Sequence, residues 1–142
     1  MSEKEKAILA LFYCQNVPRS GEKERQALEE RFGGGVRFFP LPCSGRLEPV
    51  HLLKALEEFA DAAYVITCPE GACRYFEGNR RARKRVERTR EIIGTIGLER
   101  ERVGIVFGTT EEPKTLARQT EKIMESIAAL PESPVHARSR SA

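Results

Sequence analysis

The chain has 142 residues, of which 40% are hydrophobic and 32% charged, and its formal net charge is +3. This length suits one domain with its own core, and the composition excludes a disordered or fibrous protein. No apolar run approaches the roughly 20 residues that span a bilayer, so no membrane segment is expected. The opening stretch MSEKEKAILALFYC is interpreted as a first strand and not as a signal peptide, which predicts a cytoplasmic protein.

Four apolar stretches predict β-strands, at residues 7–14, 36–43, 62–68 and 103–109. Three of them lack polar alternation, which is typical of strands buried on both faces of a parallel sheet. The second contains Pro40 and Pro42. Because proline cannot donate a hydrogen bond to a neighbouring strand, this strand is expected at an edge of the sheet.

Helices are predicted between the strands, over residues 20–32, 48–60 and 78–96 and from near Thr110 to Leu130. The glycine run at 33–35 is a stop signal for the first helix. The third helix is expected to bury one face, formed by Ala82, Val86, Ile93 and Ile96.

The alternation of strands and helices predicts a parallel sheet with helices on both faces. We therefore expect an α/β protein, a single small three-layer sandwich of the flavodoxin-like or Rossmann-like type. Its four-stranded parallel sheet should have the strand order 2-1-3-4, which places the proline-containing strand at an edge. The domain should cover residues 1–131, with a loose polar tail at 132–142.

The four cysteines are the main functional signal. Cys14, Cys43 and Cys68 each close a predicted strand, and the ends of parallel strands lie along one edge of a sheet, where open α/β folds bind ligands. Cys73 returns from the loop after the third strand. All four thiols are thus expected to meet at one place, although a single cysteine is more often a buried core residue than a ligand.

Four thiolates suit either tetrahedral zinc or an iron–sulfur cluster. Structural zinc usually takes two closely spaced cysteine pairs, whereas this chain has only one, in CPEGAC. Scattered single ligands favour a cluster. A dithiol redox site lacks its C-x-x-C motif, and a structural disulfide is uncommon in the expected compartment.

A basic segment at 78–90 holds seven of the 24 Lys and Arg residues. A solvated helix face is its simplest interpretation, and docking onto an acidic partner is the next. Nucleic-acid binding is the third and weakest interpretation, because the segment has no interleaved aromatic residues and the pI is only about 8.8.

The stretch PCSGRLEPVHLLKALEEFADAAYVITCPEGACRYFEGNRRARKRV resembles the core of the methyl-viologen-reducing hydrogenase delta subunit family. The shared features are Cys-Ser-Gly-Arg, an apolar helix ending in Ala-Asp, C-x4-C-x-Y, and Gly-Asn before a basic helix. The resemblance implies a 2Fe–2S cluster. It also implies an electron relay between a hydrogenase or formate dehydrogenase type module and the flavin subunit of a heterodisulfide-reductase-like complex.

Carried over residue by residue, Cys43, Cys68 and Cys73 match the family motif, and Cys14 matches a cysteine that closes the first strand. The family usually has a second cysteine three residues later, where this chain has Val17. The four remaining thiols still complete a ligand set by count. A zinc-binding or metal-free adaptor that bridges two enzymes stays open as the alternative.

Residues around these cysteines are expected to support the cluster. Arg46 would offset the negative charge of thiolate ligands, while Ser44 and Gly45 would donate hydrogen bonds to sulfur. Tyr75 would shield the cluster from solvent. The alternative for these four residues is an ordinary loop with an exposed arginine and a packed aromatic ring.

Overall fold

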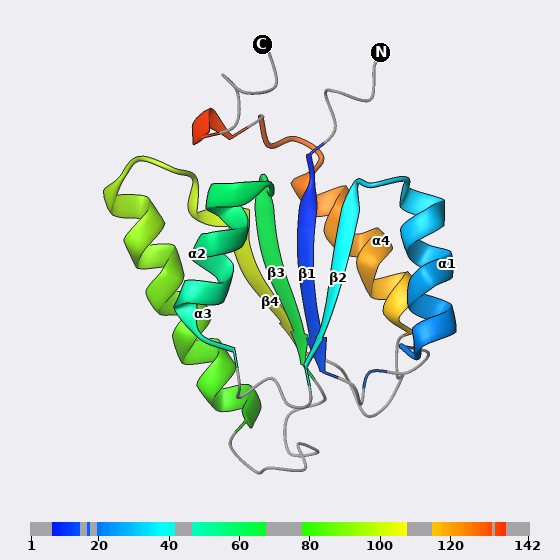
Figure 1. Ribbon diagram of the computed structural model, residues 1–142. Helices are drawn as coiled ribbons and strands as arrows, with labels where there is room; N and C mark the ends of the chain where they lie inside the picture. The colour runs from blue at the N-terminus through cyan, green and yellow to red at the C-terminus, as the bar shows by residue number, and fades with distance from the viewer. Residues whose placement is uncertain are drawn as a thin grey trace.

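The centre of the protein is a four-stranded, all-parallel sheet (Figure 1). Its strands are β1 (Leu9–Cys14), β2 (Val36–Leu41), β3 (Ala62–Thr67) and β4 (Val103–Phe107). Their order is β2-β1-β3-β4, as the sequence predicts. The computed structural model describes residues 7–14, 17, 20–41, 47–67, 78–107, 115–131 and 133–135.

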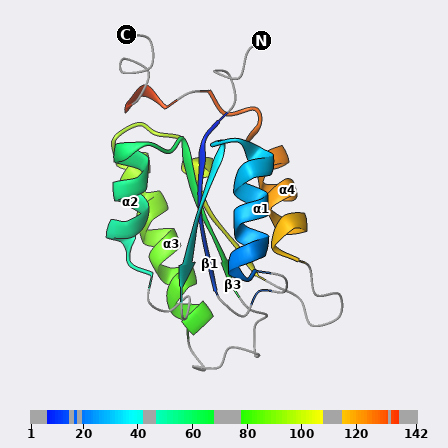
Figure 2. The ribbon, with the colours of Figure 1, turned by 45° about the vertical axis from the view of Figure 1, so that its right-hand side comes forward.

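Helices form one layer on each side of this sheet. The α-helices are α1 (Glu22–Phe32), α2 (Pro49–Glu58), α3 (Gly78–Thr95) and α4 (Leu116–Ile127), and a short 3-10 helix, η3 (Arg100–Arg102), precedes β4. Figure 2 shows α1 and α4 on one face and α2 and α3 on the other. The expected three-layer α/β sandwich is therefore confirmed. Within the residues that the structure describes, no helix is long and apolar enough to cross a membrane.

The sheet separates two apolar clusters because successive strand residues point to opposite faces. Leu9 and Leu11 of β1 pack in the cluster under α1 and α4, whereas Ala10 and Phe12 pack in the cluster under α2 and α3. Every residue of β1 is buried. This burial explains why the strand is a continuous apolar run in the sequence.

The strand β2 lies at an edge, as its prolines predict. Pro40 pairs in register with Tyr13 of β1. The burial of β2 alternates, with Val36 and Phe38 buried and Arg37 exposed. Arg37 places its guanidinium 4.5 Å from the centroid of the Phe59 ring, so this exposed side chain still contacts an aromatic ring.

The helix ends follow local sequence signals. Gly33 ends α1 with a left-handed φ of 55°, and its N–H donates to the carbonyl oxygens of Glu29 and Glu30. Thr115 caps α4, since its side-chain oxygen accepts a hydrogen bond from the Arg118 N–H at 3.2 Å. The fourth helix thus begins at Leu116, later than expected, and ends at Ile127, not at Leu130.

One predicted core residue is wrong. Ala82, Val86 and Ile93 of the basic helix are buried as expected, but Ile96 is 68% exposed. The helix ends at Thr95, one residue before it, so Ile96 does not continue the buried face.

Arg102 is a buried cation that the sequence does not predict. Its side chain is fully buried, and it donates to the Glu99 carboxylate at 2.6 Å and to the carbonyl oxygens of Asp61 and Pro131 at 2.9 and 2.8 Å. The bond from Arg102 lowers the pKa of the Glu99 carboxyl. Arg102 therefore ties η3, the residue before β3 and the segment after α4 together.

Asp61 completes this junction. Its carboxylate accepts hydrogen bonds from the N–H of Ile8 at 2.9 Å and from the N–H of Ser133 at 2.8 Å. Ser133 is only 1% exposed. The packed chain thus extends beyond Pro131, although the predicted domain boundary itself stays a prediction.

Replacing Arg102 by methionine should destabilise the fold by about 2–4 kcal/mol, because the buried bond to the Asp61 carbonyl oxygen and the part-buried bond to that of Pro131 would lose their donor. Chemical denaturation of the Arg102→Met variant measures this loss. The matched control is Arg100→Met in the same short helix, where the side chain is exposed and the expected change is within about 0.5 kcal/mol. Equal losses in both variants would contradict the role given to Arg102.

Candidate functional site

Cys14 is the last residue of β1 and the one candidate ligand within the described part of the chain. It is a free thiol and is 2% exposed. It belongs to the apolar cluster that also contains Tyr13, Val17 and Leu116. The predicted position of this thiol at the carboxyl end of a central strand is confirmed.

The other candidate residues lie outside the described residues. They are Cys43, Cys68 and Cys73, together with the predicted supporting residues Ser44, Gly45, Arg46 and Tyr75. Their assignment as ligands or neighbours of a cluster stays a prediction. Within the described ranges, no group of three or more His, Cys, Asp or Glu residues is placed to hold a metal ion.

The strand register places Cys14 beside the ends of both neighbouring strands. Cys14 pairs with Leu41, the last residue of β2, and Tyr13 pairs with Ile66 of β3, so Thr67 is level with Cys14. In the sequence, Cys43 is the second residue after Leu41, and Cys68 directly follows Thr67. Figure 1 shows the three strands ending at the same edge of the sheet.

Val17 lies next to Cys14 at this strand end. Its N–H donates to the Cys14 carbonyl oxygen at 3.0 Å, and its own carbonyl oxygen accepts the Ser20 hydroxyl at 2.6 Å. Its side chain is 5% exposed and packs in the same apolar cluster as Cys14. The strand end is therefore covered by an apolar side chain.

The donor atom of Cys14 suits a soft metal better than a hard cation. Among the described residues, the thiol packs with apolar and aromatic side chains. Mg²⁺ and Ca²⁺ require oxygen ligands, while thiolates are the ligands of zinc and iron–sulfur clusters. The chemistry of the donors at this edge is thus compatible with an iron–sulfur cluster.

The helix α3 brings positive charge to this same edge. It begins at Gly78, at the end of the sheet where the strands finish (Figure 1), and its first turn contains no acidic residue. Arg80, Arg81 and Lys84 are exposed on its first turns. The positive end of the helix dipole adds to these cations, so the start of α3 favours a negatively charged group.

The ring of Tyr13 is also part of this end of the sheet. Burial raises the pKa of the Tyr13 hydroxyl, and this effect outweighs the opposite influence of Arg25. The phenol therefore stays protonated near neutral pH. It packs edge-on against Phe38 with ring centroids 6.3 Å apart, which makes it a wall of the apolar cluster and not a charged ligand.

Comparison with known proteins identifies the type of chain. A family model described as "Methyl-viologen-reducing hydrogenase, delta subunit" matches residues 9–131. This range covers the whole sheet and all four α-helices.

Individual relatives agree with this match. The chain is 26% identical over 126 residues to the vhu iron-sulfur subunit of the F420-non-reducing hydrogenase of Methanopyrus kandleri, covering 89% of this chain and 96% of the relative. It is 30% identical over 130 residues to the vhc iron-sulfur subunit of the F420-non-reducing hydrogenase of Methanococcus voltae, covering 92% and 90%. It is also 33% identical over 92 residues to one polypeptide of the ferredoxin:CoB-CoM heterodisulfide reductase of Methanosarcina mazei, covering 65% of this chain but 12% of that polypeptide.

The burial of Cys14 predicts a protected thiol. In a variant whose other three cysteines are serine, Cys14 should react with Ellman's reagent at least about a hundredfold more slowly than an unfolded thiol, because the reagent needs an accessible thiolate. The rate of thionitrobenzoate release in native buffer and in denaturant measures this protection. Adding an exposed thiol by Val50→Cys, at a position that is 59% exposed, provides the control that should react at once. A Cys14 thiol that reacts as fast as this control would contradict the described burial.

Proposed function

We propose, because the chain belongs to the methyl-viologen-reducing hydrogenase delta subunit family, that it is an electron-transfer subunit of a hydrogenase or heterodisulfide-reductase type complex. More specifically, it would carry one 2Fe–2S cluster. The observation that carries this proposal is the register of β1, which sets the buried Cys14 level with the strand ends that lead into Cys43 and Cys68. The relatives named as iron-sulfur subunits support it.

The proposed ligands are Cys14, Cys43, Cys68 and Cys73. Neighbouring strands are about 4.8 Å apart, and consecutive Cα atoms about 3.8 Å. Cys68 is one residue from Thr67, so its Cα is within about 9 Å of the Cys14 Cα; the two residues from Leu41 to Cys43 give a bound of about 12 Å. Chain connectivity thus allows Cys43 and Cys68 each to approach Cys14, which is compatible with one shared cluster.

The described residues would bind and shield such a cluster. When bound, a 2Fe–2S cluster supplies one-electron transfer. Cys14 would ligate the cluster from the side of the sheet. Val17 and Tyr13 would keep water away from that side. The cationic start of α3 would offset the negative charge of the thiolates, which favours the reduced form.

The predicted supporting residues keep their proposed roles. Arg46 would add a further positive charge, and Ser44 and Gly45 would donate hydrogen bonds to sulfur. Tyr75 would cover the cluster on its solvent side. Each of these effects would shift the reduction potential and leave the ligand set unchanged.

The partners follow from the relatives. We infer that electrons pass between a dehydrogenase module, of hydrogenase or formate dehydrogenase type, and a flavin subunit of heterodisulfide-reductase type. The match to 12% of a heterodisulfide reductase polypeptide supports this pairing, because a segment similar to this chain is there part of a longer protein. We infer that two segments joined in one polypeptide there bind each other as separate chains here.

A structural adaptor is the second candidate, and Val17 is the observation that favours it. The family position usually held by a second cysteine is here a buried valine in the apolar cluster. If that thiol is required for iron, the chain would bind zinc or no metal and would only bridge two enzymes. Metal content separates the two candidates.

The ligand role of Cys14 is tested by the iron and acid-labile sulfide content of the full chain purified without oxygen. Cys14→Ala should lose at least about two thirds of the bound iron, because one of four thiolate ligands is gone. Val36→Ala is the matched control: Val36 is 1% exposed in the same apolar cluster, so its truncation costs stability but removes no ligand. Unchanged iron content in Cys14→Ala, or equal loss in Val36→Ala, would refute the assignment.

A further inference from the structure

Arg85 belongs to the basic segment 78–90, but its side chain turns inward, toward the residues that precede α2. Its Nη1 donates to the Leu47 carbonyl oxygen at 2.8 Å, and its Nη2 lies 3.6 Å from the Glu48 carboxylate. The Arg85 side chain is 29% exposed, against 67% for Arg88 one turn later. Arg85 therefore connects α3 to the start of α2 instead of joining a solvated helix face.

The start of α2 is a compact turn. The Glu48 N–H donates to Nδ1 of His51 at 2.9 Å, and the His51 N–H donates to the Glu48 carbonyl oxygen at 2.9 Å. Leu47 is fully buried and belongs to the same apolar cluster as Val86 of α3. Burial is not directional, whereas a hydrogen bond is, so the bond from Arg85 fixes the orientation of the Leu47 carbonyl group.

Leu47 ends a short segment that contains Cys43. Five residues separate Leu47 from Leu41, the last residue of β2, and Leu41 is held by the pairing of β2 with β1. The Cα atom of Cys43 is at most about 8 Å from that of Leu41 and about 15 Å from that of Leu47. The sheet thus holds one end of this segment, and Arg85 holds the other.

The helix that contains Arg85 follows the second cysteine segment. Cys73 is five residues before Gly78, where α3 begins, and Arg85 lies about 10 Å further along the helix axis. Figure 1 shows α2 and α3 both beginning at the end of the sheet where the strands finish. The contacts of Arg85 therefore connect the segment that contains Cys43 with the helix that follows Cys73.

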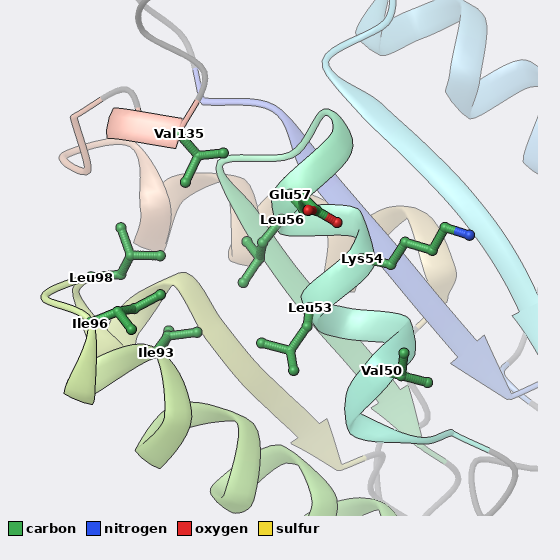
Figure 3. Close-up of a pocket in the computed structure, with 9 residues that line it drawn as sticks. All are labelled: Val50, Leu53, Lys54, Leu56, Glu57, Ile93, Ile96, Leu98 and Val135. Atoms are coloured by element: carbon green, nitrogen blue, oxygen red, sulfur yellow. The ribbon is translucent and has the colours of Figure 1, made fainter.

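Apolar packing between α2 and α3 is open farther along the two helices. A groove of about 520 Å³ lies between them, with Leu53 and Leu56 of α2 and Ile93 of α3 among its lining residues (Figure 3). Leu47 and Arg85 do not line this groove. Because side chains do not fill the space there, apolar contacts restrain the helix pair less than a closed interface does. The polar contacts of Arg85 supply a restraint at the start of α2.

We propose that Arg85 is a positioning residue for the cluster site, which holds the segment with Cys43 against the helix that follows Cys73. This inference rests on the proposed function, because it concerns the proposed ligands. Arginine suits the role, since its planar guanidinium donates to a carbonyl oxygen and faces a carboxylate at the same time. Without these contacts the segment opens locally more often, and a bound cluster is lost faster although no ligand is removed.

The test compares Arg85→Gln and Arg85→Lys with the wild type in two measurements on the full chain. In metal-free protein, amide hydrogen exchange over residues 43–48 should be at least about tenfold faster in Arg85→Gln, while exchange in β1 and α4 stays unchanged. In protein purified without oxygen, iron release to a chelator should be at least about tenfold faster. Arg85→Lys should give intermediate rates, because an ammonium group keeps the charge but not the planar pair of donors.

Arg88→Gln is the matched control, since Arg88 is on the same helix and pairs with Glu91 at 3.4 Å near the surface. It removes the same charge and should change both rates by less than about twofold. Unchanged exchange over residues 43–48 in Arg85→Gln, an equal acceleration in β1, or unchanged iron release would overturn the proposal. A wild-type chain without iron would refute the proposed function, whereas exchange in metal-free protein still decides whether Arg85 holds the segment.

Discussion

The position of β1 between β2 and β3 is the constraint on which the rest of the site depends. Parallel pairing on both sides forces three strand ends to one edge, and the register sets Cys14 level with Leu41 and Thr67. Because β1 is buried on both faces, a shift of one residue would move its apolar residues to the wrong clusters. Core packing thus fixes the position of the Cys14 thiol. The residues that stabilise the sheet therefore also position this candidate ligand at its edge.

The sequence predicts most of this fold because each signal is local. Pro40 and Pro42 place β2 at an edge, the glycine run ends α1, and uninterrupted apolar runs indicate strands covered on both faces. The burial of Arg102 and the exposure of Ile96 are not predictable in this way. The partners of Arg102 come from the residue before η3, the residue before β3 and the segment after α4. Such a buried cation depends on tertiary contacts between distant segments, and Ile96 follows a helix whose last residue periodicity alone does not fix.

Of the candidate site, the strand-end position of Cys14 was predictable, because it follows from the end of an apolar run. Its packing against Val17 was not, since nothing local indicates that the chain after β1 returns a buried side chain to the same cluster. The same turn is where this chain departs from the family pattern. Val17 thus connects the packing of the strand end with the proposed ligand set.

The two ends of the sheet differ in their chemistry. The cysteine edge combines a buried thiol with the cationic start of α3, which suits a negatively charged cluster. The opposite end bears the junction of Asp61 with Arg102, which ties distant segments of the chain together. The first turns of the basic helix α3 lie at the cysteine edge.

The central claim is that four cysteines bind one 2Fe–2S cluster in spite of the valine at position 17. The most direct measurement is the iron and acid-labile sulfide content of the wild-type chain purified without oxygen, together with its EPR spectrum after dithionite reduction. A chain with one 2Fe–2S cluster should contain about two irons and two sulfides and give an S = 1/2 signal when reduced. Stoichiometric zinc, or a chain without metal, would contradict the central claim and would leave a structural adaptor in its place.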